Sequence, residues 1–256
     1  MIARYWNEIE WIRTSLKYIL QWDPDKIIIS EGNWSNHKSF AGRENSNDGT
    51  AEIVRKFVMS DDRCMMLNGL RMSEDYRTNQ AATCREALRL AGAGVGDWFI
   101  TIDCDSFVSE SSISLLKGFM KDERWCYFPY IINHFFWDIE TCVKLRDIHG
   151  NLLPRRILPG SDFVNANHFG LKGKYYTGCK FVPSLTLDEF GIEGHHYLGI
   201  KSQQRIVDRY NMGDKLKWKP EILGYDKKRV PFTGKHPRIA QENLKILCGG
   251  CVNAVS

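Results

Sequence analysis

The chain has 256 residues, with 35 Lys and Arg against 31 Asp and Glu, and a net charge of +4 at neutral pH. This length fits one large α/β domain, or one domain with a C-terminal extension, and it can bury a sizeable core. So mild a charge, with no basic block, is compatible with phosphate-bearing substrates but does not single out nucleic acid, so we expect no nucleic-acid partner.

The expected compartment is the cytoplasm. We find no signal peptide and no apolar run long enough to cross a bilayer, so no integral membrane segment is expected. Several of the eight cysteines lie in apolar or helical runs, where a free thiol behaves as a small hydrophobe. Cys248 and Cys251 form a CxxC pair without the second pair that a zinc ribbon needs, and their role stays open.

The first 105 residues alternate between strand and helix patterns. Strands are indicated by short β-branched or apolar runs, and helices by apolar residues at helical spacing. The expected elements are a short apolar start at 1–3, a helix at 7–22, a strand at 26–30, a loop at 32–47, a helix at 51–58, a strand at 65–67, a helix at 79–91 and a strand at 97–102. This alternation predicts an α/β fold with a mostly parallel sheet and helices on its faces.

The second half of the chain has a more mixed pattern. A helix is expected from Ser109 or Glu110 to about Lys121. The further expected elements are strands at 125–128, 130–132 and 155–158, and helices at 201–213 and 238–247. We therefore expect a mixed region after the parallel sheet.

Two carboxylates, Asp103 and Asp105, follow the apolar run Trp98 to Ile102. Ligands of open α/β sheets bind at the carboxyl ends of strands. At a spacing of two, both carboxylates can converge on one hard cation, and Mg²⁺ or Mn²⁺ prefers such oxygen donors. The alternative is that this segment only ends a strand and starts a turn.

An ordered set of segments resembles the family 2 glycosyltransferases, which use nucleotide-sugar donors and have the GT-A fold. The first three segments cover about residues 1–110, and the C-terminal match is looser. The matching segments are Ala3-Arg4-Tyr5-Trp6-Asn7-Glu8; Ile27-Ile28-Ile29-Ser30-Glu31 with Ser46-Asn47-Asp48-Gly49-Thr50; Asp97 to Asp105 with its Asp-x-Asp ending; and His195-His196-Tyr197 with Phe232 to Pro237. Glu31 stands where the family usually has Asp, and the loop after it is longer.

The resemblance implies a single GT-A domain over residues 1–256, a Rossmann-like, mostly parallel sheet with a mixed acceptor-side region. Residues 1–110 would be the nucleotide-sugar-binding half, 111–213 the acceptor and metal half, and 214–256 a C-terminal extension. The implied activity is transfer of a sugar from a nucleotide-sugar, most simply a UDP- or GDP-sugar, to a hydroxyl of a carbohydrate or glycan acceptor, with inversion.

The resemblance also implies the residues of the donor site. Asn7, Glu8, Glu31, Asp48, Arg77 and Asp103 are the expected nucleotide-sugar contacts. Asp105, with Asp103 nearby, is expected to hold Mn²⁺ or Mg²⁺, which neutralises the diphosphate of the leaving group.

The pair His195 and His196 is a second source of metal ligands. Imidazole suits Mn²⁺ better than Mg²⁺. In an extended segment the two rings point to opposite sides, so only one of them would face the metal. The neighbouring Gly191 and Gly194 indicate a loop that can close over a ligand.

A catalytic base is needed if the sugar is inverted, because the acceptor hydroxyl must lose its proton. Asp188 and Glu189 are the first candidates, and only one of them could serve because they point apart on a strand. Asp162 and Asp138 follow as weaker candidates.

Two other function classes stay open. A nucleotidyltransferase would also use paired carboxylates and Mg²⁺ on a nucleotide, but it would need a Gly-rich phosphate loop, and Arg4 to Glu8 contains no glycine. A carbohydrate-binding module without catalysis would use exposed aromatic residues. The sugar, the nucleotide base, the acceptor, the stereochemistry and the oligomeric state do not follow from the sequence.

Overall fold

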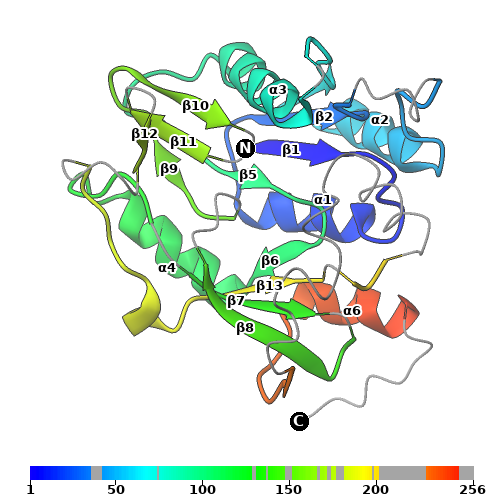
Figure 1. Cartoon of the computed structure of the whole chain (residues 1–256), viewed down its shortest axis with the longest axis vertical. Coiled ribbons are helices and arrows are strands. Elements are labelled where there is room, and N and C mark those ends of the chain that lie inside the picture. Colours follow the sequence, from blue (N-terminus) through cyan, green and yellow to red (C-terminus); the bar gives the residue numbers. More distant parts are fainter. Residues whose placement is uncertain are drawn as a thin grey trace.

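The computed structural model describes residues 1–35, 42–73, 75–128, 131–136, 138–147, 152–165, 168–171, 174–176, 182–197, 199–201 and 229–247. Its central element is a four-stranded parallel sheet in the order β3-β2-β1-β5 (Figure 1). The strands are β1 (Ile2–Tyr5), β2 (Ile27–Glu31), β3 (Cys64–Asn68) and β5 (Thr101–Ile102). β1 and β2 are completely buried, as expected of central parallel strands covered on both faces.

Helices cover both faces of this sheet (Figure 1). One face, with Ala3 and Ile29, packs with residues of α1 (Ile12–Gln21) and α2 (Thr50–Ser60) in one hydrophobic cluster. The other face, with Ile2 and Ile28, packs with α3 (Tyr76–Ala91) in a second cluster. The predicted α/β class, with a mostly parallel sheet flanked by helices, is therefore confirmed.

Local sequence signals set several helix ends. The side chain of Asp75 accepts hydrogen bonds from the N–H groups of Arg77 and Thr78 and so caps α3, which ends at Gly92 in a left-handed conformation. Ser109 caps α4 (Glu110–Met120) in the same way. The predicted helices at 109–121 and 238–247 correspond to α4 and α6 (Arg238–Leu247).

The apolar run after Asp97 is divided between two sheets instead of forming one strand, and the strand just after it joins a third sheet. β4 (Trp98–Phe99) pairs with β9 (Arg155–Arg156), β5 pairs with β1, and β6 (Ser106–Val108) pairs with β13 (Glu193–His196). Asp103 and Asp105 lie in the turn between β5 and β6. This turn therefore connects the parallel sheet to a second sheet.

The second sheet is mixed and has the order β14-β8-β7-β13-β6 (Figure 1). Its other strands are β7 (Ile131–Phe136), β8 (Thr141–Asp147) and β14 (Val230–Pro231). β13 runs parallel to β7 and antiparallel to β6. Gly191 and Gly194 were expected to mark a loop that closes over a ligand, but Gly194 lies in β13, which places both histidines in a central strand between two hydrogen-bonded neighbours.

Other predicted boundaries also differ. The first helix begins at Ile12 instead of residue 7, because Asn7 has a φ of 51° and residues 7–11 form turns. The strand expected at 125–128 is reduced to isolated bridges at Tyr127. An antiparallel sheet of β10 (Ser161–Asn165), β11 (His168–Leu171) and β12 (Lys174–Tyr175) was not predicted.

Some predictions fall outside the described residues, namely the helix at 201–213 and the pair Cys248 and Cys251. The described cysteines are all buried, in keeping with their apolar surroundings in the sequence; they are Cys64, Cys84, Cys104, Cys126 and Cys142. Within the described ranges, no helix is both long and apolar enough to cross a membrane.

Gly194 leaves space that the side chain of Asn133 fills. A Cβ at residue 194 would lie 1.9 Å from Oδ1 of Asn133, so we expect Gly194→Ala to lower the free energy of unfolding by about 1–3 kcal/mol. Asn133→Ala should restore most of this loss in the double variant. Gly118→Ala on α4 is the control, because nothing lies within 4 Å of its Cβ position, and it should be neutral or stabilising. Urea unfolding of the four variants measures the effect, and equal losses at 194 and 118 would contradict it.

Candidate functional site

Polar side chains gather at the carboxyl edge of the parallel sheet. Glu8 follows β1, Glu31 ends β2, and Asp103 and Asp105 follow β5. Glu8, Glu31 and Asp105 are buried at exposures of 4%, 1% and 1%. Carboxylates are seldom fully buried unless they are paired, so each needs a partner.

The loop after β2 returns to this edge and is hydrogen-bonded to it. The N–H of Asn7 donates to Oγ of Ser46 over 2.8 Å, and Oδ1 of Asn7 accepts from the N–H of Asn47 over 3.0 Å. Asp48 accepts from the N–H groups of Ile9 and Thr50 through its two oxygens, at 3.0 and 2.9 Å. Asn7 and Asp48, both predicted to contact the nucleotide-sugar, thus join the loops after β1 and β2.

Glu31 has one satisfied and one open carboxylate oxygen. Its Oε1 accepts from the N–H of Ser46 over 2.8 Å. Its Oε2 is buried and has no hydrogen-bond partner in the structure. Two buried indoles, Trp6 and Trp34, pack together just after the ends of β1 and β2. An open, buried acceptor suits a ligand that offers an N–H or O–H donor.

Asp103 is held by a buried arginine. Nη2 of Arg4 donates to Oδ1 of Asp103 over 2.9 Å, with side-chain exposures of 3% and 19%. The two residues are 99 positions apart in the chain. The side chain of Asp103 is therefore partly exposed at this edge of the sheet, and Arg4 fixes its orientation.

A lysine joins Glu8 and Asp105. Nζ of Lys201 lies 2.8 Å from Oε2 of Glu8 and 2.9 Å from Oδ2 of Asp105. The three side chains are 2%, 6% and 1% exposed. The ammonium group balances part of the charge of two buried carboxylates, and removal of one member of such a group leaves an uncompensated charge.

The two histidines of β13 point to opposite sides, as the alternation of a strand predicts. Nε2 of His196 lies 3.4 Å from Oδ1 of Asp105. His195 instead stacks on Phe136, with ring centroids 5.8 Å apart and an angle of 4° between the planes. Only His196 therefore faces the strand-end carboxylates.

His195 belongs to a buried group of rings with His134 and His236. Burial, and then the charges of His134 and His236, lower the pKa of His195 to about 3, so its ring is neutral at physiological pH. Burial also lowers the pKa values of the other two. Nε2 of His134 contacts Oε2 of Glu193 at 2.9 Å, and Nδ1 of His236 contacts the hydroxyl of Tyr197 at 2.9 Å.

The predicted metal ligands are only partly brought together. Among the described side chains, no three of His, Cys, Asp or Glu are placed to hold a metal ion. Oδ1 of Asp105 and Nε2 of His196, 3.4 Å apart, are close enough to share one ion as neighbouring ligands. Mg²⁺ and Mn²⁺ sites often use one or two protein ligands with substrate phosphates, so this pair fits a site that a diphosphate completes. Asp103 is tied to Arg4, and His195 faces away.

The predicted catalytic bases lie in the segment that precedes β13. Residues 188–190 form a short 3₁₀ helix, and not the expected strand. Glu189 is exposed, and Phe190 packs on Phe119 of α4. β13 then carries the chain from this helix to His196. The side chain of Asp188 lies outside the described residues.

The remaining candidates have partners of their own. Asp162 pairs with Arg85 through both carboxylate oxygens, each 2.9 Å from Nε. Asp138 accepts from the N–H groups of Glu140 and Thr141 in a turn. Arg77 is exposed at the start of α3, where its guanidinium group lies over the ring of Tyr76.

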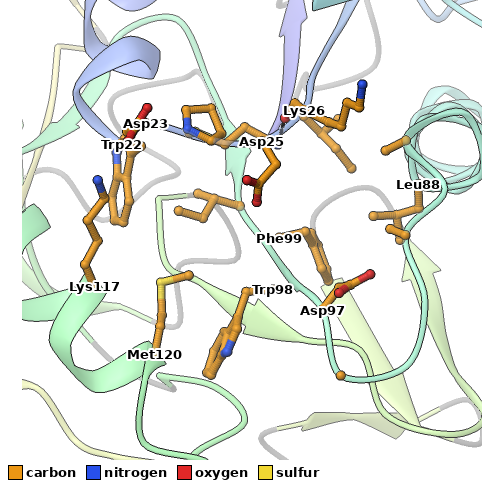
Figure 2. Close-up of a pocket in the computed structure, with 17 residues that line it drawn as sticks. Trp22, Asp23, Asp25, Lys26, Leu88, Asp97, Trp98, Phe99, Lys117 and Met120 are labelled. Atoms are coloured by element: carbon orange, nitrogen blue, oxygen red, sulfur yellow. Dashed lines mark hydrogen bonds between the residues drawn. The ribbon is translucent and has the colours of Figure 1, made fainter. Parts of the chain in front are cut away.

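Two surface cavities lie elsewhere. One of about 530 Å³ opens at the opposite, amino edge of the sheet, between Trp22, Leu88, Trp98 and Met120, with the carboxylate of Asp25 directed into it (Figure 2). Another, of about 700 Å³, lies between α1 and α2. Neither is lined by the strand-end carboxylates.

Two residues of this site were not predicted, Arg4 as the partner of Asp103 and Lys201 as the partner of Asp105. Arg4 lies in a segment that the resemblance covers, but nothing local indicates which acid it meets. Lys201 follows the His pair closely and carries no motif. Both assignments depend on contacts between distant parts of the chain.

Comparison with known proteins adds no family assignment. No protein-family model matches the chain, and the search of curated proteins finds no match.

Lys201→Met should strongly destabilise the protein. The variant leaves Glu8 and Asp105 buried without their shared ammonium group, so we expect a loss of about 3–5 kcal/mol in the free energy of unfolding. Lys17→Met is the matched control, because Lys17 is 67% exposed and pairs loosely with Glu242 at 3.7 Å, and it should cost less than about 1 kcal/mol. Chemical unfolding at neutral pH measures both, and equal effects would refute the role of Lys201.

His195 should make the fold sensitive to mild acid. Its pKa is about 3 in the folded state and 6.5 ordinarily, so the unfolded state binds more protons and stability falls as the pH drops below about 6.5. Between about pH 6.5 and about pH 5 this histidine should account for about 2 kcal/mol. His195→Phe keeps the stacking and should flatten that part of the stability profile. An unchanged slope, measured by urea unfolding at each pH, would contradict the buried neutral ring.

Proposed function

We propose that the protein is a glycosyltransferase of GT-A type that transfers a sugar from a nucleotide-sugar to a hydroxyl of a carbohydrate acceptor. The observation that carries the proposal is the set of acids at one edge of the parallel sheet, with Glu31 at the end of β2 and Asp103 and Asp105 after β5. Nucleotides bind at this edge in open α/β sheets. The ordered resemblance of residues 1–110 to family 2 enzymes supports the same reading.

Glu31 suits the nucleoside. The open Oε2 of Glu31 can accept a hydrogen bond from a base N–H or a ribose hydroxyl. Asp103, fixed by Arg4 and partly exposed, is placed to meet the ribose. A UDP- or GDP-sugar is the donor class we propose, because both bases carry ring N–H groups.

Asp105 and His196 are the residues that would hold Mn²⁺ or Mg²⁺. Such an ion neutralises the charge of a diphosphate leaving group. Lys201 keeps Oδ2 of Asp105 occupied and thereby leaves Oδ1 as the oxygen on the side of His196. The ammonium group of Lys201 also adds positive potential next to the diphosphate position.

The mixed sheet is the proposed acceptor side. It begins directly after Asp105 and contributes His196 to the same place, so an acceptor held along it would reach the donor at the strand ends. Asp188 and Glu189 remain the proposed bases, and inversion remains the proposed stereochemistry. A cytoplasmic location is part of the same proposal.

Calorimetric titration of UDP and GDP with and without Mn²⁺ tests the proposal. Binding of one nucleotide should tighten markedly with Mn²⁺, and Asp105→Asn should remove that difference. Glu31→Gln should weaken binding by about 10–100-fold, because one acceptor oxygen becomes a donor. Asp162→Asn is the control. Asp162 lies on β10, and its carboxylate pairs with Arg85 of α3, outside the strand-end site. The absence of metal-linked nucleotide binding would refute the proposal, and pyrophosphate release from a nucleoside triphosphate would favour a nucleotidyltransferase.

A further inference from the structure

Arg155 is a buried cation without a hydrogen-bond acceptor. It lies on β9 with an exposure of 6%, and neither Nη1 nor Nη2 has a hydrogen-bond partner in the structure. Its neighbour Arg156 differs, because Nε and Nη1 donate to the carbonyl groups of Gly96 and Glu123, each over 3.1 Å. Arginine has five N–H donors, and burying them unpaired is costly. An acceptor is therefore missing at Arg155.

Among the described residues, the groups whose charges act on Arg155 are Cys84, Arg4 and Tyr176, and none of them is a carboxylate. The guanidinium carbon lies 5.8 Å from the centre of the Phe99 ring. The pKa of Arg155 is lowered to about 10, chiefly by burial and also by the charge of Arg4, while Cys84 and Tyr176 act to raise it. Arg155 thus stays charged at neutral pH and lies near a second guanidinium group.

Ser30 adds a hydroxyl on the same face of the sheet. It is the register partner of Arg4, two residues beyond the pair Ile2 and Ile28 that packs in the cluster with Cys84 and Phe99. Ser30 is 0% exposed, and its Oγ has no hydrogen-bond partner in the structure. Arg4 and Ser30 therefore lie side by side on the face of the sheet that α3 covers, and the charge of Arg4 acts on Arg155.

The charges of this region do not balance. Asp103 compensates Arg4 at 2.9 Å, which leaves the charge of Arg155. Cys84 does not supply a negative charge, because burial raises the pKa of its thiol. One positive charge with unpaired N–H donors is the chemistry that holds a single small anion.

We propose that Arg155, near the charge of Arg4, binds one compact inorganic anion of the halide class. The compact size follows from burial, because both terminal nitrogens of Arg155 are shielded from solvent. The single charge of such an ion matches the single uncompensated cation. This site is separate from the nucleotide site and does not depend on the proposed transferase activity. Its occupancy would stabilise the contact between β9 and β4 and the region around Arg4.

Thermal unfolding of the full chain in sodium gluconate, chloride, bromide and phosphate at equal ionic strength tests this site. Chloride and bromide should raise the unfolding midpoint over gluconate by roughly 5 °C at concentrations far above Kd. No difference between halide and gluconate would overturn the proposal. A rise with phosphate but not with halide would overturn the assignment to a compact monovalent ion.

Two variants test whether the halide effect arises at Arg155. Arg155→Met should abolish the halide effect and be at least as stable as the wild type in gluconate, because it removes an uncompensated buried charge. Arg156→Met should keep the halide effect, since this side chain bonds to carbonyl groups. A halide effect that survives Arg155→Met would overturn the proposal. Crystals grown in bromide give a measurement that needs no variant: an anomalous peak at Arg155 is expected, and its absence with bromide bound elsewhere would overturn the site.

Discussion

The contact of Lys201 with Glu8 and Asp105 is the constraint on which the arrangement of the site depends. It joins the loop after β1, the turn between β5 and β6, and the chain just beyond β13. Because all three groups are buried, none can leave the others without exposing an uncompensated charge to the interior. The parallel sheet and the mixed sheet are thus held at a fixed distance at the point where Asp105 meets His196.

At the same edge of the sheet, some polar side chains hold the structure together and others stay available for a ligand. Asn7 and Asp48 use their polar groups to fasten loops, and Arg4 orients Asp103. After these contacts, the unsatisfied oxygen of Glu31 and the pair Asp105–His196 are the features of the described edge that suit a ligand. Our proposal of a nucleotide-sugar site rests on these features, and not on the full set of acids that the sequence offers.

Much of the fold could be predicted because its signals are local. The β-branched run of β2, the caps Asp75 and Ser109 and the apolar spacing of α6 each specify an element within a few residues. The position of Asp103 and Asp105 at the carboxyl edge follows from the strand–helix alternation. The placement of His195 and His196 could not be predicted, because β13 exists only through pairing with β6 and β7. The partners Arg4 and Lys201 likewise depend on contacts across 99 and 193 residues of chain.

The loop that returns from Ser46 to Glu31 has an evolutionary consequence. Both ends of this segment are fastened to the sheet, at Gly32 through the carbonyl of Tyr5 and at Ser46 through Glu31 and Asn7. A longer segment between these anchors need not move the carboxylate, since loop-closure entropy grows slowly with length. The length of this segment can thus vary in evolution while Glu31 keeps its position.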